Sequence, residues 1–321
     1  MSSSLNQTTW PAVFILIGIP GLEDVQIWFS IPMFIMYVLV VSGNTIISFI
    51  ILSEESLHKP MCLLLCALSI ADVLLATTTT PKILSIFWFH STEIGYRDCL
   101  AQLFFVHAFS IMESTILLAM AFDRYIAICN PLRYTSILTN TTIANIGIVA
   151  IIRGSVLTAP TCFLIWRLSY CRTNIISHTY CEHMAVVKLS CSDTTINRVY
   201  GLTVALLVIP VDILCITVSY CAICRTVFKL SSTEARHKAL GTCGPHICVI
   251  LISYIPTLFS FFTHRFGQNI PLHIHIIIAN LYLLVTPMCN PIIYGARTTE
   301  IRESIIMFYK RGKCNRHWDF I

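Results

Sequence analysis

Seven long apolar stretches constrain this chain more than any other feature of its sequence. Each is long enough to cross a bilayer as a helix, which takes about 20 mostly apolar residues. Charged residues make up only 12% of the chain, against roughly 25% in a soluble domain. The sequence therefore predicts an all-α membrane protein, a seven-transmembrane helix bundle embedded in the lipid bilayer. The predicted spans lie near Trp28–Leu52, Met61–Phe87, Cys99–Cys129, Ile143–Ile165, Ile196–Val227, Leu240–Phe262 and His273–Tyr294.

The segments between the spans predict a multi-pass topology with the N-terminus outside and the C-terminus in the cytoplasm. Residues 1–27 form the expected extracellular N-terminus, since Asn6 begins a glycosylation sequon and no signal peptide is recognisable. Most of the 21 lysines and arginines then fall in cytoplasmic segments, as the positive-inside rule requires. Residues 28–295 form the seven-span domain. In the cytoplasmic tail, 296–321, an apolar face predicts a short amphipathic C-terminal helix along the membrane.

Composition also excludes several function classes. The formal net charge of +5 is scattered between spans, so it does not predict a nucleic-acid partner. The His and Cys residues form no paired catalytic motif, so the chain is not expected to be an enzyme. Cys221 and Cys224 have a zinc-like spacing without a second pair, and we expect no metal there.

The triplet Asp123-Arg124-Tyr125 closes the third predicted span. Charged residues at such a position are costly to place there. The pair can bind to itself or release Arg124 to another partner, which suits a signalling switch. The alternative is an interfacial pair that only anchors the helix end.

Polar residues inside the spans are functional hypotheses by default. Asn44, Asp72, Glu113 and Asn290 all lie within predicted spans. Asp72 and Glu113 could converge on a cation such as sodium or share a proton, or they could belong to a hydrogen-bonded cluster that joins helices. Two further charges, Arg153 and Asp212, suggest nothing sharper than internal pairing or access to water.

Four cysteines lie in segments predicted to be extracellular, where disulfides form. They are Cys99, Cys171, Cys181 and Cys191. Four cysteines allow three pairings, and the sequence alone does not choose among them.

Taken together, these residues resemble the rhodopsin-like G-protein-coupled receptors, a family of transducers. The segments LHKPM, MAFDRYIAICNPLRY, KALGTCGPH and PMCNPIIYGARTTEIR resemble those of odorant (olfactory) receptors. The GIPGLE and THRFG segments are similar to the class I, fish-like branch. The resemblance covers nearly the whole chain, with its motifs in the right order.

The resemblance implies an odorant receptor in the cell membrane that activates an olfactory stimulatory G-protein and raises cyclic AMP. It implies disulfides Cys99–Cys181 and Cys171–Cys191, and a buried polar or cation site at Asp72 and Glu113. Arg124 would be released on activation to meet Tyr220. Further switch residues would be His246, Tyr254, Asn290 and Tyr294. Two residues depart from the family's motifs: Cys62 stands in place of the usual tyrosine after LHKPM, and Pro245 in place of the serine before His246. These departures bear on surface expression and basal activity.

The same resemblance predicts a ligand site. Arg265 lies just past the sixth span, and an arginine fork matches a carboxylate. Relatives use the matching arginine for an acid headgroup, and positions matching His107 and His183 line the site. Phe261 would add apolar wall, which favours an aliphatic carboxylic acid of medium chain length. Further wall candidates are Phe104, Phe105, Ile111, Leu206 and Phe262.

Each of these assignments has an alternative. Arg265 could be an interfacial anchor, and each histidine a packing residue. The chain could instead be a non-olfactory chemosensor for small acids, or a transporter that uses its buried charges, although no inverted repeat of broken helices supports transport. Cys314 stands among basic residues, which suits palmitoylation or a free thiol.

Overall fold

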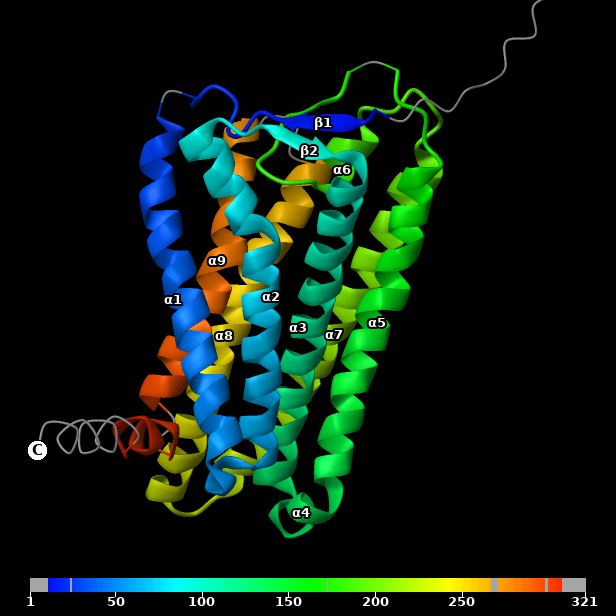
Figure 1. The fold of residues 1–321 in the computed structure, drawn as a ribbon. Coiled ribbons are helices and arrows are strands. Elements are labelled where there is room, and N and C mark those ends of the chain that lie inside the picture. The colour runs from blue at the N-terminus through cyan, green and yellow to red at the C-terminus, as the bar shows by residue number, and fades with distance from the viewer. Residues whose placement is uncertain (1–10, 24, 172, 267–270, 298–299, 308–321) are drawn as a thin grey trace, which may run out of the picture.

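The computed structural model describes residues 11–23, 25–171, 173–266, 271–297 and 300–307, without the side chains of 261, 263–266 and 296–297. Seven helices in it are long and apolar enough to cross a membrane, which confirms the predicted bundle (Figure 1). They are α1 (Gln26–Ser53), α2 (Pro60–Phe89), α3 (Tyr96–Cys129), α5 (Asn140–Trp166), α7 (Thr195–Lys229), α8 (Thr233–Phe266) and α9 (Leu272–Arg297).

Six of these helices match their predicted spans to within a few residues at each end, and α8 does not. Helix α8 begins at Thr233, seven residues before the predicted start at Leu240. Its first turns, TEARHKA, are polar, and hydropathy marks only the part of a helix that lies in lipid. The predicted division into segments 1–27, 28–295 and 296–321 stays a prediction.

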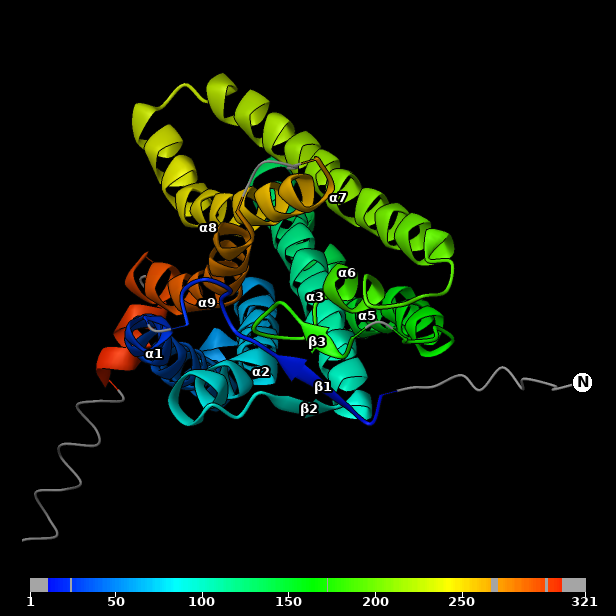
Figure 2. The same cartoon turned by 90° about the horizontal axis from the view of Figure 1, so that it is seen from above.

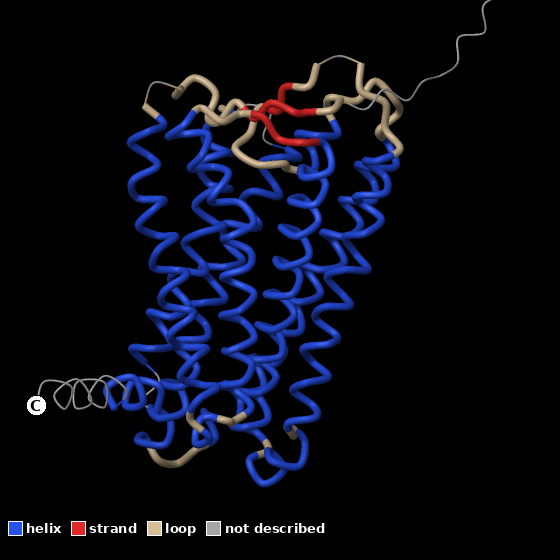
Figure 3. Tube along the Cα trace, in the orientation of Figure 1, coloured by secondary structure: helices blue, strands red, loops and turns tan. Residues whose placement is uncertain are grey.

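A small sheet closes one end of the bundle, which we call the sheet end (Figure 3). Strand β1 (Val13–Leu16) is central, antiparallel to β2 (Glu93–Gly95) and parallel to β3 (Ile175–Ile176). Phe14 is fully buried beneath this sheet, with its ring 5.5 Å from that of Tyr170. The sequence prediction contained no strands, because three-residue pairings carry no periodic signal.

Short helices connect the long ones. A 3-10 helix, Glu55–Leu57, joins α1 to α2. A second 3-10 helix, Pro131–Arg133, and α4 (Tyr134–Ile137) join α3 to α5 at the end of the bundle opposite the sheet. Helix α6 (His183–Val187) lies at the sheet end. Residues 300–307 form a further helix. Its Ile301 is 1% exposed and its Ile305 packs on the core of the bundle, while Arg302 and Glu303 are exposed, so the predicted amphipathic helix is confirmed.

Helix α3 lies in the middle of the bundle when it is viewed from the sheet end (Figure 2). It packs against α2, α5, α7 and α8. It comes close to α5 at Gly154, where a Cβ atom would stand 2.6 Å from the carbonyl oxygen of Ala108. Only glycine allows the two backbones to come this close. The outward faces of the helices carry exposed Ile, Leu, Val and Phe side chains, as contact with lipid requires.

Candidate functional site

The described part of the structure contains a cavity of about 300 Å³ between the helices, toward the sheet end. Helices α3, α5, α7, α8 and α9 form its walls, and the loop that leads into α6 covers it. The lining is mostly apolar, as ligand pockets in proteins usually are. Its residues are Val106, His107, Ser110, Ile111, Glu113, Ser114, Leu117, Leu157, Thr158, Thr161, Tyr180, Glu182, His183, Met184, Gly201, Val204, Ala205, Val208, Ile209, Ser253, Tyr254, Thr257, Ser260, Ala279, Tyr282 and Leu283.

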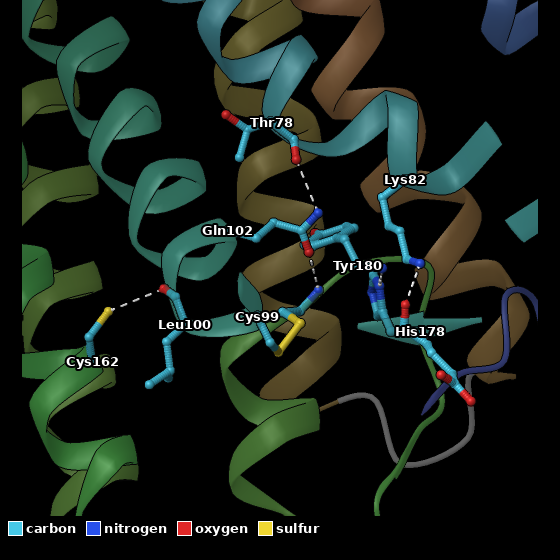
Figure 4. The surroundings of a disulfide bond; sticks show 10 residues. Thr78, Lys82, Cys99, Leu100, Gln102, Cys162, His178 and Tyr180 are labelled. Carbon is cyan, nitrogen blue, oxygen red and sulfur yellow. Dashed lines mark hydrogen bonds between the residues drawn. A yellow bond between two sulfur atoms is a disulfide. The ribbon is translucent and has the colours of Figure 1, made fainter. Parts of the chain in front are cut away.

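A disulfide fixes the loop over the cavity. Cys99 at the start of α3 is bonded to Cys181, and the Gln102 amide oxygen accepts a hydrogen bond from the Cys181 backbone N–H at 2.9 Å. The Gln102 Nε2 donates in turn to the Thr78 carbonyl oxygen at 3.0 Å, so the loop is tied to two helices (Figure 4). A second disulfide joins Cys171 to Cys191. Both bonds have the pairing that the resemblance implies.

Both predicted histidines reach the cavity. His107 lines it from α3, and His183 lines it from the start of α6. The His183 ring lies against α7 at Gly201, where a Cβ atom would come within 2.8 Å of its Cε1 atom. The neighbouring loop residue Tyr180 also lines the cavity; burial raises the pKa of its phenol, so at neutral pH Tyr180 offers a hydroxyl group and no charge.

The other ligand predictions have mixed outcomes. Phe261 and Arg265 lie near the end of α8, and their side chains are outside the described part of the structure. Ile111 lines the cavity, and Phe104 is absent from the lining. The expected wall contributions of Phe105, Leu206 and Phe262 are wrong, since these side chains are 44%, 51% and 53% exposed on the outside of the bundle. The rotation of each helix decides which apolar residues face inward, and this rotation was unknown from the sequence.

A charged network lies beneath the cavity, and its residues carry only a weak signal in the sequence. Arg153 of α5 and Asp212 of α7 form a two-pronged ion pair, with both N–O distances at 2.9 Å. The Ser114 hydroxyl donates to Asp212 and is bonded to the Tyr254 hydroxyl at 2.7 Å. Ser114 and Tyr254 also line the cavity. The network therefore connects four helices to the cavity floor. Of the two alternatives that the sequence leaves open for Arg153 and Asp212, the structure shows internal pairing.

Two buried carboxyl groups lie close together at the same cavity, and one of them, Glu113, lines it. Asp72 is fully buried and Glu113 is 5% exposed, and the two groups interact with each other. The Asn290 amide donates to Asp72 at 2.7 Å. Asn44 binds elsewhere, because its amide donates to the Val40 and Pro287 carbonyl oxygens. Asp72 Oδ1, Glu113 Oε1 and Asn290 Oδ1 have no hydrogen-bond partner among the described residues. Oxygen atoms of this kind are the ligands of a hard cation, and a pair of carboxyl groups can share a proton.

The Asp-Arg-Tyr triplet lies at the end of α3 opposite the sheet. Arg124 Nε is 3.8 Å from Asp123 Oδ2, while Asp123 Oδ1 accepts a hydrogen bond from the Tyr134 hydroxyl at 2.8 Å. Arg124 is thus held weakly by its neighbour, whose carboxylate has a second partner. Tyr125 packs on the adjoining core of α7 and α8.

The remaining switch residues form a second contact beside the triplet. The Tyr220 hydroxyl is hydrogen-bonded to His246 Nδ1 at 2.7 Å. Tyr294 is 3% exposed in the core beneath. The predicted glycosylation site, Asn6, lies outside the described residues.

Three comparisons place this arrangement among known proteins. A sequence profile described as "Olfactory receptor" matches residues 33–311. Human olfactory receptor 52P1 is 56% identical over 94% of this chain and 94% of its own length, and human olfactory receptor 52N1 is 52% identical over 98% and 99%. The fold is similar to that of squid rhodopsin, with a TM-score of 0.71 at 17% sequence identity, covering 90% of this chain and 86% of that one.

The match with the family extends over most of the chain and agrees with the geometry. Five of the seven long helices line a covered cavity, and the triplet lies at the far end of the central helix α3, which is one of the five. Proteins of this kind are signalling receptors and not enzymes. The chain belongs to the olfactory receptor family of rhodopsin-like G-protein-coupled receptors, multi-pass proteins of the plasma membrane that sense odorants.

Proposed function

We propose that this receptor binds an aliphatic monocarboxylic acid of medium chain length in the cavity and activates a stimulatory G-protein that raises cyclic AMP. The observation that carries the proposal is the pair of histidines, His107 and His183, in an otherwise mostly apolar lining. Imidazole N–H groups donate hydrogen bonds to a carboxylate. Arg265, near the end of the helix that carries Tyr254 and Thr257, supplies the positive charge in this proposal.

The rest of the lining restricts which acid fits. Its walls of Val, Leu and Ile side chains suit an alkyl chain, and about 300 Å³ is the lower end of the volumes usual for small-molecule pockets. Two carboxyl groups, Glu113 and Glu182, also border the cavity. A second carboxylate on the ligand would meet these groups and lose its hydration, which disfavours dicarboxylic acids.

A fatty-acid series tests the headgroup. Cells that express the receptor are given straight-chain acids of increasing length and their methyl esters, and cyclic AMP is measured for wild type, Arg265→Ala and His107→Phe. We expect a response to acids of medium length, a much weaker one to the esters, and a large rightward shift of the acid response in both variants. Equal potency of an acid and its ester, or an unchanged acid response in Arg265→Ala, would remove the headgroup contact from the proposal.

For signalling, the proposal places the sheet end outside the cell and the triplet at the G-protein. In this proposal Arg124 contacts the G-protein, because its ion pair with Asp123 is weak, with an N–O distance of 3.8 Å. Arg124→Ala should reach the cell surface at near wild-type level and give no cyclic AMP response. Full signalling by this variant at normal surface level would refute the assignment. Asp72 and Glu113 would hold a sodium ion or share a proton in the same cycle.

A further inference from the structure

The hydroxyl groups around the cavity differ in how they are satisfied. Five of them have a hydrogen-bond partner in the protein. Ser110, Ser253 and Thr257 donate to the carbonyl oxygens of Val106, Val249 and Ser253, one turn earlier in their own helices, at 2.8, 2.8 and 2.7 Å. Ser114 and Tyr254 belong to the charged network. These groups need nothing from a ligand.

Thr158 on α5 is different. It lines the cavity and is 2% exposed, and its Oγ1 atom has no hydrogen-bond partner among the described residues. A buried hydroxyl without a partner costs free energy, which explains why such groups are rare in folded proteins. Thr161 lies one turn further along the same face, and it too lines the cavity.

The packing of α5 on α3 explains why this hydroxyl faces the cavity. The two helices touch at Gly154, whose missing side chain leaves room for the Ala108 carbonyl oxygen. Thr158 follows Gly154 by one helical turn, on the same side of α5. It therefore lies on the side of α5 that faces α3, where it lines the cavity.

We propose that Thr158, with Thr161 beside it, forms a second polar subsite that hydrogen-bonds an oxygen atom in the chain of the ligand. The preferred ligand class is then a hydroxy- or oxo-substituted aliphatic acid and not a plain fatty acid. The inference rests on the proposed function for the acid headgroup, but the subsite itself acts on the chain oxygen alone. A site built to hydrogen-bond an oxygen discriminates against the analogue that lacks it, because its own polar group is then left without a partner.

The test compares nonanoic acid with hydroxy- and oxo-nonanoic acids that carry the oxygen at successive carbons. Cyclic AMP responses are measured in wild type, Thr158→Val, Thr161→Val and the control Thr203→Val. Valine keeps the shape of threonine and removes the hydroxyl. Thr203 lies on the exposed side of α7, where its hydroxyl donates to the Val199 carbonyl oxygen. Each compound is also tested as its methyl ester.

For wild type we expect one position of the oxygen to lower the half-maximal concentration about tenfold relative to nonanoic acid, which corresponds to about 1.4 kcal/mol. Thr158→Val should abolish this preference, and Thr203→Val should keep it. A preference that survives in Thr158→Val, or no oxygenated compound better than nonanoic acid in wild type, would overturn the subsite.

The esters separate this inference from the headgroup proposal. If the headgroup assignment fails and esters are as potent as acids, the Thr158-dependent preference for an oxygenated chain should still appear among the esters. If the headgroup assignment holds and the preference is absent, only the subsite is wrong. Silence of wild type toward every compound, at normal surface level, counts against both.

Discussion

The ion pair between Arg153 and Asp212 offers the sharpest test of how this bundle is held together. The Asp212 side chain is 1% exposed and that of Arg153 is 23% exposed. In Arg153→Met, Asp212 loses both guanidinium hydrogen bonds and keeps only the Ser114 hydroxyl as a donor. Removing one partner of a buried ion pair costs about 3–5 kcal/mol, because the remaining charge stays buried without compensation.

The reverse change should cost less. In Asp212→Leu, Arg153 keeps its hydrogen bond to Thr115 at 3.0 Å and its partial access to the surface. The double variant removes both charges, and replacing a buried pair by apolar side chains of similar volume is often neutral or stabilising. The double variant should therefore be more stable than Arg153→Met alone, a non-additivity that a double-mutant cycle measures directly.

The assay is thermal unfolding of the purified receptor in detergent, followed by a thiol-reactive dye. Lys59→Met is the matched control, since Lys59 and Glu300 are 54% and 51% exposed and such exposed pairs contribute about 0–1 kcal/mol. A midpoint for Arg153→Met equal to that of Lys59→Met would refute the reasoning, as would effects of the two single changes that simply add in the double variant.

Three further predictions follow from the packing. Gly154→Ala should lower the unfolding midpoint markedly, because the added Cβ atom would meet the Ala108 backbone at 2.6 Å. The control Gly147→Ala, on the same helix, adds a Cβ atom with nothing within 4 Å, so it should be neutral or stabilise by up to about 1 kcal/mol. Equal midpoints for the two variants would contradict this prediction. Surface expression, measured by antibody labelling of intact cells, should fall more in Cys99→Ser than in Cys171→Ser. The first disulfide closes a separation of 82 residues and the second one of 20, so loop entropy gives them stabilising contributions of about 4.5 and 3.3 kcal/mol. The opposite order of surface expression would count against this prediction. Gly201→Ala should displace the His183 ring, whose Cε1 atom would lie 2.8 Å from the added Cβ atom, and so weaken the acid response at unchanged surface level. A dose–response curve for the acid equal to that of wild type would contradict this prediction.

Several properties could be predicted from the residues alone, because they depend on the solvent around each segment. A span must be apolar along its whole length when its surroundings are lipid, so the seven helices and their order follow from hydropathy. The cost of a charge in such a span marks Asp72, Glu113, Arg153 and Asp212 as residues that need partners. Motif resemblance then predicted the family, which the sequence profile and the human relatives confirm.

The partners themselves were decided by the tertiary structure. Hydropathy is nearly the same on all sides of these helices, so it does not fix how each one is rotated about its axis. The sequence therefore allows Phe105, Leu206 and Phe262 to face the cavity, but they lie outside, whereas Thr158 and Thr161 face inward. The pairing of Arg153 with Asp212 and the strand formed by Val13–Leu16 likewise join residues far apart in the chain. Such contacts depend on how the helices and loops pack together, a property of the whole bundle that no single segment contains.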